Sequence, residues 1–303
     1  MNPDKQRLND TLTTLDGAYA PATLRAYRED VEALIDFCIK LNAKAFPVNP
    51  ETLAAFIAKK TQSGVKSASI RRAVAAIGTL HRLNRFEDPS KDPIVTIAMR
   101  KMHRALGREA KQAQGISIAD LNRMLKVTED TLKGQRDRAL LLFAYDSLLR
   151  RSEIVAIEVS DCRWTTSKNR PLLQIHLRRS KTDPEGLGRW LSVPEGTQTA
   201  ISTWLKASGI TQGPLFRGIR GNKITASLGA SQINRVYKRL AQKAGLQERL
   251  PQAISGHSFR VGAAQDLLRA GATLPMIMHR GRWTKPDTVM RYLEHAAIFD
   301  HPE

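Results

Sequence analysis

The chain has 303 residues, enough for two domains of ordinary size, and 42% of them are hydrophobic, enough to fill their cores. Lysine and arginine number 48 against 29 aspartate and glutamate residues, which gives a formal net charge of +19. This surplus on a globular composition indicates a polyanionic partner, with nucleic acid as the first candidate. The longest apolar run, ALLLFAY from Ala139, falls far short of the ~18 residues that a membrane-spanning helix needs.

The two cysteines have no second cysteine or histidine at metal-ligand spacing. Cys38 lies in an apolar helical run and is expected in the core, while Cys162 stands in an unrelated context. This usage argues against a disulfide scaffold or a zinc site and fits a reducing, cytoplasmic location. The N-terminal stretch MNPDKQRLND is too polar for a secretory signal.

Helical periodicity dominates the first third of the chain. TLRAYREDVEALIDFCIKL repeats apolar residues at helical spacing, with Thr23 as the expected N-cap. Further helices are predicted at PETLAAFIAKKTQSG, with Pro50 in its first turn, and at IVTIAMRKMHRAL. SASIRRAVAAIGTLHRL carries an apolar stripe and places Arg71 and Arg72 on the opposite face. Together these patterns predict a compact helical domain over residues 1–106.

Residues 107–116, GREAKQAQGI, have little apolar content and are predicted to form an interdomain linker without core residues. A second domain is expected over residues 117–303. Ser117, followed three residues later by Asp120, marks the start of a helix at SIADLNRML. RDRALLLFAYDSLL is apolar nearly all round, which predicts a buried central helix.

The hydrophobic period then changes from that of a helix to that of a strand. In RPLLQIHLRRSKTDPEGLGRWLSVP, Leu173, Ile175 and Leu177 alternate with polar residues, DPEG is a turn, and RWLSVP returns as a second strand. Helices resume at TQTAISTWLKASG, ASQINRVYKRLAQKAG and TVMRYLEH. The predicted fold is mainly α in two domains: a helical N-terminal domain and a mixed α+β domain with a small antiparallel sheet.

The stretch SGHSFRVGAA places His257 and Arg260 three residues apart at the start of a helix. Residues at this spacing face the same side of a helix. One interpretation is a helix start capped by Ser255 or Ser258, with both basic side chains in solvent. The other is an anion site, where free N–H groups and two cationic donors converge on a phosphate.

Further polar side chains interrupt the predicted elements. Arg150 ends the buried helix with Glu153 three residues later, Lys181 lies at the hairpin tip, and Trp283 precedes Tyr292 by nine residues. Phosphoryl transfer needs its developing charge neutralised and its leaving oxygen protonated. Arginines suit forked contacts to phosphate oxygens, a mobile lysine suits general acid catalysis, and a tyrosine can be the nucleophile. The alternative for Lys181 is a solvent-exposed place at a hairpin tip, where lysines serve solubility. The alternative for Trp283 is packing in the core.

The order R…K…HxxR…W…Y, with the strings LLRRSEI, SGHSFRVGAAQDLLRAG, IMHRGRWT and VMRYLEH, resembles the tyrosine recombinase (phage integrase) superfamily. The similarity covers nearly the whole chain, strongly from Leu148 to His295 and more faintly in the helical N-terminal half. A single HxxR is unspecific, whereas the complete ordered set is very specific. The resemblance implies the two-domain fold of that superfamily, with a SAM-like helical domain that clamps DNA against the catalytic domain.

The resemblance also implies a role for each site residue. Arg150 and Arg260 would bind the scissile phosphate, and Tyr292 would attack it to give a 3′-phosphotyrosine. Lys181 would protonate the leaving 5′ oxygen, while His257 would hydrogen-bond the phosphate and assist proton transfer. Glu153 would orient the basic cluster, and Trp283 would donate its indole N–H at a position where many relatives carry histidine. Because the phosphotyrosine conserves the bond energy, no ATP is expected. Two arginines in place of Mg²⁺ would make the reaction independent of metal, and no other cofactor is expected. A free 5′ hydroxyl then attacks, which makes and resolves a Holliday junction.

The expected partner is a double-stranded DNA target with inverted-repeat arms. Four copies of the protein are expected to assemble on two such sites, and the protein is expected to be monomeric in free solution. The candidate DNA contacts are Thr23, Arg25, Arg71, Arg72, Ser231, Gln232, Arg235 and Arg239, although the basic residues among them are equally compatible with solvated helix faces. The short apolar cluster after Tyr292, Ala296 to Phe299, is expected to be a shortened docking peptide for a neighbouring protomer.

Three alternatives to a recombinase remain open on the sequence. A type IB topoisomerase shares the Arg–Lys–Arg–Tyr chemistry but relaxes supercoils by strand rotation. A non-catalytic DNA-binding regulator shares the charge and the helices, yet it has no need of the ordered polar set. A protein that binds anionic membranes explains the charge alone.

Overall fold

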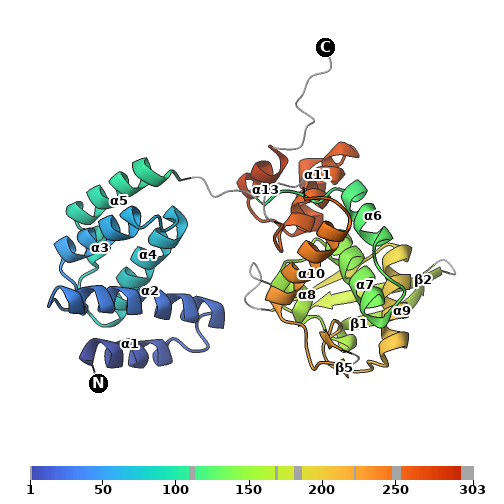
Figure 1. Cartoon of the computed structure of the whole chain (residues 1–303), viewed down its shortest axis with the longest axis horizontal. Helices are drawn as coiled ribbons and strands as arrows, with labels where there is room; N and C mark the ends of the chain where they lie inside the picture. The colour runs from blue at the N-terminus through green and yellow to red at the C-terminus, as the bar shows by residue number, and fades with distance from the viewer. Residues whose placement is uncertain are drawn as a thin grey trace, which may run out of the picture. The chain divides into compact units, whose positions relative to one another are not determined.

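The computed structural model describes residues 2–108, 113–167, 170–180, 186–221, 223–247 and 254–294. The chain divides into two compact units, Met1–Lys111 and Gln112–Glu303, each drawn in Figure 1 with its helices and strands. Within the described ranges, every helix is too short or too polar to cross a membrane. The predicted hairpin tip and the predicted docking peptide lie outside the described residues.

Helices alone form the regular structure of the N-terminal unit. They are α1 (Pro3–Thr14), α2 (Pro21–Lys40), α3 (Pro50–Gln62), α4 (Ser67–Leu83), the 3-10 turn η1 (Pro89–Lys91) and α5 (Pro93–Leu106). Four of these α-helices begin with proline, whose missing N–H is not needed in a first turn. The side chains of Asn2, Asn49 and Asp92 accept hydrogen bonds from the first free N–H groups of α1, α3 and α5.

Two features of this unit differ from the prediction. Thr23 does not cap α2, because the helix already begins at Pro21 and its N-cap is Ala20, which makes no side-chain cap hydrogen bond. Helix α1 was not predicted, since its apolar content is low and it buries only Leu8, Thr11 and Leu12. The other predicted helices of the unit are confirmed.

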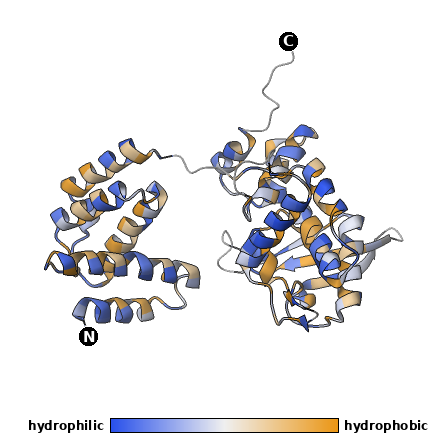
Figure 2. Cartoon of the chain, viewed as in Figure 1, coloured by the Kyte–Doolittle hydropathy of each residue, from blue (hydrophilic) through white to orange (hydrophobic). Residues whose placement is uncertain are grey.

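The core of the N-terminal unit forms along the predicted apolar stripes. Ile70, Ile77 and Leu80 of α4 are buried together with Cys38 of α2, as expected. In Figure 2 the helices of this unit carry hydrophobic and hydrophilic residues on different sides. The unit therefore buries one face of each amphipathic helix and leaves the charged faces to solvent.

The second unit combines helices with two small sheets. Its elements are α6 (Ile118–Lys126), α7 (Leu132–Ser147), α8 (Arg151–Ala156), the 3-10 turn η2 (Val159–Asp161), β1 (Cys162–Ser167), β2 (Arg170–Leu177), β3 (Arg189–Ser192), α9 (Glu195–Ser208), β4 (Ile219–Arg220), β5 (Lys223–Ile224), α10 (Ala230–Lys243), α11 (Ser258–Arg269), α12 (Leu274–Gly281) and α13 (Pro286–Leu293). The predicted capping box of Ser117 and Asp120 is present at α6.

The main sheet has the antiparallel order β1-β2-β3, and its core side carries the predicted residues Leu173, Ile175 and Leu177. Strand β1, the β4–β5 hairpin and α12 were not predicted. The sequence of β1, CRWTTS, is largely polar, β4 and β5 have two residues each, and α12 contains a proline in its first turn. Short or polar elements of this kind carry too little periodicity to be identified.

Helix α7 is the central element of this unit, as its apolar sequence predicts. It is buried along nearly its whole length and packs against α9 and α11. Ile116, at the end of the predicted linker, is fully buried, and its N–H donates to the carbonyl of Ser258 at 2.9 Å. The prediction that residues 107–116 contribute nothing to the core is therefore wrong for Ile116. Its chain runs so close to α11 that a Cβ on Gly262 would lie 1.8 Å from the Ile116 carbonyl oxygen.

A buried histidine links two segments of the N-terminal unit. The Nε2 atom of His81 accepts the Val48 N–H at 3.0 Å, and its Nδ1–H donates to the Ile77 carbonyl at 2.8 Å. The ring lies between Phe46 and Phe86. Burial lowers the pKa of His81, because a protonated ring would carry a charge in the core and could no longer accept the Val48 N–H.

We predict that this unit loses stability in mild acid. The folded pKa of His81 lies below the unfolded value of about 6.5, so its contribution is present above that pH and is lost as the pH falls through the folded pKa. Urea unfolding at about pH 7.5 and about pH 5.5 measures the loss. His81→Gln removes the titrating group and should reduce the difference between the two pH values. Equal differences in both proteins would contradict the prediction.

Candidate active site

Arg150 lies at the junction between the end of α7 and the start of α8. Leu148 closes the helix in the left-handed conformation (φ 50°), and the backbone then turns extended at Arg150, the N-cap of α8. Glu153 accepts the Arg150 backbone N–H at 2.8 Å with Oε2 and the Arg150 Nη1–H at 2.7 Å with Oε1. The Arg150 side chain is therefore held at the helix junction by a buried carboxylate.

His257 and Arg260 lie at the beginning of α11 but differ in exposure. His257 is the N-cap residue and is exposed, whereas Arg260 is only 2% exposed. Neither Ser255 nor Ser258 caps the helix from the N-cap position. Instead, the Ser258 hydroxyl accepts the Ser255 N–H, and the Ser255 hydroxyl accepts the His257 N–H. The interpretation that both basic side chains are in solvent is wrong for Arg260.

The buried guanidinium of Arg260 joins the ends of two helices. It donates hydrogen bonds to the carbonyl of Leu148 at the end of α7 and to the carbonyl of Gly281 at the end of α12. Burial lowers the pKa of Arg260 to about 9, and repulsion from Arg150 and Arg282 contributes to the shift. The group remains protonated at neutral pH and keeps further N–H donors at its edge.

Trp283 packs between Arg260 and Tyr292. The Arg260 guanidinium lies over the indole ring, 4.2 Å from its centroid, and the Tyr292 ring meets the indole edge-to-face at 5.8 Å. This placement requires glycine at 281, where an added Cβ would lie 1.8 Å from the indole ring. The Tyr292 carbonyl accepts the Gln265 side-chain N–H at 2.9 Å, which fastens α13 to α11.

The imidazole of His257 titrates in a positive environment. Although the residue is exposed, neighbouring protein atoms displace part of the water around the ring, and this desolvation is the main cause of its lowered pKa. Repulsion from Arg260, Arg150 and Arg151 lowers the pKa further, and Glu153 opposes them. The neutral imidazole is favoured until an anion enters the site.

Six of the seven predicted site residues therefore come together: Arg150, Glu153, His257, Arg260, Trp283 and Tyr292. Lys181 lies outside the described residues. In the described part of the chain, no group of three or more His, Cys, Asp or Glu side chains is arranged to hold a metal ion. Several guanidinium groups face a single carboxylate, an arrangement suited to binding a phosphate.

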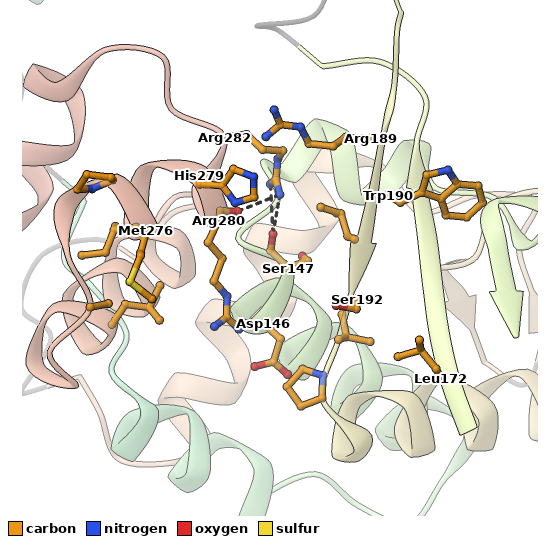
Figure 3. A pocket seen from close by; sticks show the side chains of 17 residues that line it. Asp146, Ser147, Leu172, Arg189, Trp190, Ser192, Met276, His279, Arg280 and Arg282 are labelled. Atoms are coloured by element: carbon orange, nitrogen blue, oxygen red, sulfur yellow. Dashed lines mark hydrogen bonds between the residues drawn. The ribbon is translucent and has the colours of Figure 1, made fainter. Parts of the chain in front are cut away.

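Sequence reasoning missed Arg282, which lies between Gly281 and Trp283. Its buried guanidinium reaches the carbonyl groups at the end of α7. It lines an open pocket of about 840 Å³ between β3, α12 and the end of α7 (Figure 3). The string IMHRGRWT contains this arginine, but no periodicity distinguishes it, because it belongs to a turn between two helices.

The predicted DNA contacts differ in exposure and in whether they already have a partner. Arg25, Arg71, Ser231 and Arg235 are exposed and, among the residues that the structure describes, their side chains have no hydrogen bond or ion pair. Thr23 is half-buried in the first turn of α2. The remaining three side chains, Arg72, Gln232 and Arg239, already have partners within the protein.

Those three partners give the side chains a structural role. Arg72 forms a fork to Asp30 at 2.7 and 3.0 Å, which joins α4 to α2. Gln232 accepts the Gly229 N–H at 2.6 Å at the start of α10. Arg239 pairs with the buried carboxylate of Asp137 on α7, whose other oxygen accepts from Arg136 at 2.6 Å.

Two family models match the sequence: the Phage integrase family over residues 115–297 and the Phage integrase N-terminal SAM-like domain over residues 12–87. Recombinase Cre of Escherichia phage P1 is 30% identical over 276 residues, which cover 86% of this chain and 80% of Cre. An integrase/recombinase XerD homolog of Selenomonas ruminantium is 29% identical over 297 residues, 94% of this chain and 85% of that protein.

The fold agrees with solved recombinase structures. XerH site-specific recombinase bound to palindromic difH substrate has a TM-score of 0.69 at 15% identity, with 98% of this chain and 85% of XerH covered. A lambda integrase tetramer bound to a Holliday junction gives 0.68 at 13% identity, with 98% of this chain and 79% of the integrase chain covered. Because the integrase model matches more than half of the sequence and Cre is similar over most of its length, this chain belongs to the phage integrase family and is a site-specific tyrosine recombinase.

Proposed function

We propose that this recombinase cleaves double-stranded DNA through a covalent 3′-phosphotyrosine at Tyr292 and rejoins the strands through a Holliday junction. The observation that carries the proposal is the contact series from Arg260 through Trp283 to Tyr292, with Arg150 near enough to Arg260 to lower its pKa by repulsion. It places the Tyr292 ring on the far side of Trp283 from the Arg260 guanidinium, so that a nucleophile and cationic phosphate ligands, which in-line attack on a phosphodiester requires, belong to one cluster.

In the proposed cleavage step, the Tyr292 Oη attacks the scissile phosphorus and passes its proton to the neutral imidazole of His257. The bond between phosphorus and the 5′ oxygen breaks, and the 5′ oxygen takes up a proton from Lys181. Arg150 and Arg260 neutralise the non-bridging oxygens, and His257 and the Trp283 indole N–H add hydrogen bonds. In the reverse step, a 5′ hydroxyl of the partner duplex gives its proton to Lys181 and attacks the same phosphorus, and Tyr292 leaves with a proton returned by His257.

The electrostatics of the site support a phosphate ligand. The pKa values of Arg260 and His257 are both lowered, in part by repulsion between the basic groups. A phosphate would replace this repulsion by attraction and favour protonation of His257. Phosphate binding is therefore expected to take up a proton in the range where the imidazole titrates.

We propose that both units contact the DNA backbone. Arg25 and Arg71 of the first unit and Arg235 of the second are the proposed phosphate contacts, because they are exposed and unengaged among the described residues. Ser231, in the first turn of α10, is an exposed candidate for contact with a base edge or a phosphate. Arg72 and Arg239 would have to leave their carboxylate partners before contacting DNA.

The proposed assembly is a tetramer that joins two DNA sites with inverted-repeat arms. Lambda integrase, which shares the fold, has been crystallised as a tetramer bound to a Holliday junction. Exchange of strands between two duplexes needs four cleavages, so four nucleophiles are expected in one complex. The free protein is proposed to be monomeric.

We predict a covalent protein–DNA adduct on a nicked duplex that carries the target site, selected beforehand from random duplexes by binding. The nick lets the short cleaved end diffuse away, so the adduct accumulates even in EDTA. Tyr292→Phe should abolish the adduct, because the nucleophilic oxygen is missing. Tyr19→Phe, at an exposed tyrosine of the N-terminal unit, is the control and should leave it unchanged. An adduct that survives Tyr292→Phe would falsify the nucleophile assignment.

Two arginines on α10, Arg235 and Arg239, are predicted to have different roles, the first in DNA binding and the second in stability. Arg235→Ala should weaken DNA binding and reduce the slope of log affinity against log salt by about 1, without a change in unfolding free energy. Arg239→Ala should lower the free energy of unfolding by about 1–3 kcal/mol, because the buried Asp137 loses one donor. Salt titrations and urea unfolding of both variants measure these effects, and the reverse assignment would contradict the prediction.

A further inference from the structure

Arg282 occupies a backbone position that disfavours it. Its φ of 57° and ψ of 45° lie in the left-handed region, where a Cβ crowds the backbone and glycine is favoured. The side chain is not directed into solvent, since the residue is only 7% exposed. An arginine at this position therefore needs an explanation in the contacts of its head group.

The guanidinium of Arg282 binds the free carbonyl groups at the end of α7. Its Nη1 and Nη2 atoms both lie 3.2 Å from the Ser147 oxygen, and Nη2 lies 3.0 Å from the Leu148 oxygen. The last carbonyls of a helix have no partner within the helix and form the negative end of its dipole. Figure 3 shows the guanidinium directed at Ser147, with Arg189 beside it. A planar fork with several donors suits this group of acceptors better than an ammonium does.

These contacts connect the segments that carry the proposed phosphate ligands. Leu148 lies two residues before Arg150, and Arg282 directly precedes Trp283. The Leu148 carbonyl also accepts from Arg260, which in addition donates to the Gly281 carbonyl. Arg260 and Arg282 therefore fasten the same two turns together from two sides, although those turns are more than 130 residues apart in the chain.

Arg282 also adds positive charge to the site. Burial lowers its pKa to about 10, Glu153 opposes that shift, and Arg150 and Arg189 add to it. No carboxylate among the described residues forms an ion pair with Arg282, and its Nε atom is buried without a hydrogen-bond partner. Its charge is therefore compensated by carbonyl dipoles and adds to the positive potential of the site.

We propose that Arg282 is a positioning residue for DNA cleavage, which fixes the turn carrying Arg150 against the turn carrying Trp283. Arg282 acts through these two residues and makes no contact with the substrate. The inference rests on the proposed phosphotyrosine mechanism. It goes beyond that mechanism because it assigns the relative placement of the guanidinium ligands and the nucleophile to a residue outside the ordered polar set.

The test is Arg282→Gly in the full-length protein. Glycine takes up the backbone conformation without strain, and the substitution leaves a space with free carbonyl groups. Arg85→Gly is the matched control, because Arg85 also has a positive φ (61°) but its side chain is exposed and unengaged among the described residues. Single-turnover adduct formation on the nicked duplex, DNA affinity and the thermal midpoint are measured for both variants.

The expected result is a fall in the adduct rate of about 30-fold or more for Arg282→Gly, with DNA affinity within about threefold of the unsubstituted protein. Guanidinium ion at about 20 mM should restore the rate at least about fivefold, since it can reoccupy the vacated site. It should not restore Tyr292→Phe. Arg282→Lys keeps the charge without the fork and should give an intermediate rate. Arg85→Gly should cleave at the unsubstituted rate.

Several outcomes would overturn the proposal and can be told apart. If the unsubstituted protein forms no adduct, the proposed function itself fails. If it forms the adduct and Arg282→Gly cleaves at the same rate, the positioning role fails alone. A slow Arg282→Gly that also loses its thermal transition and shows no rescue by guanidinium indicates a purely structural role, which equally contradicts the proposal.

Discussion

The burial of a charged guanidinium is the constraint on which the site depends. Arg260 is 2% exposed and can remain charged only because its N–H groups reach the carbonyl oxygens of Leu148 and Gly281. Those carbonyls belong to the ends of α7 and α12, so both helices must end at the same place. Arg150 follows one of these ends and Trp283 the other. The placement of Arg150, the proposed phosphate ligand, relative to Trp283, which contacts the proposed nucleophile Tyr292, is therefore fixed by the core of the fold.

This arrangement leaves excess positive charge at the site when DNA is absent. Burial lowers the pKa of Arg260 and of His257, and repulsion from neighbouring guanidinium groups around Glu153 lowers both further. Under the proposed mechanism, a phosphate oxygen in the site would add attraction to each of these basic groups. The hydrophobic core around α7 supplies the stability that tolerates this repulsion. The mutual repulsion of the basic groups and the proposed affinity for a DNA phosphate are in this sense two consequences of one cluster.

Much of the fold could be predicted because burial imposes a period on the sequence. The stripe of α4 and the alternation of β2 follow directly from which residues are buried. Thr23 was misassigned as a cap because Pro21 begins α2 two residues earlier. The order of polar residues identified six side chains that lie together, yet the burial of Arg260 and the contacts of Arg282 could not be predicted. Both depend on helix ends that are distant in sequence, and no local pattern records that contact.

The most direct measurement is a crystal structure of the covalent complex trapped on a nicked duplex. We expect continuous density between Tyr292 Oη and phosphorus, with both non-bridging oxygens within about 3 Å of nitrogen atoms of Arg150 and Arg260. The contacts of Arg260 with the ends of α7 and α12 should be the same as in the free protein, because the site is assembled before DNA arrives. A phosphate linked to another residue, or one that Arg260 does not contact, would contradict the assignment of this cluster as the phosphate site.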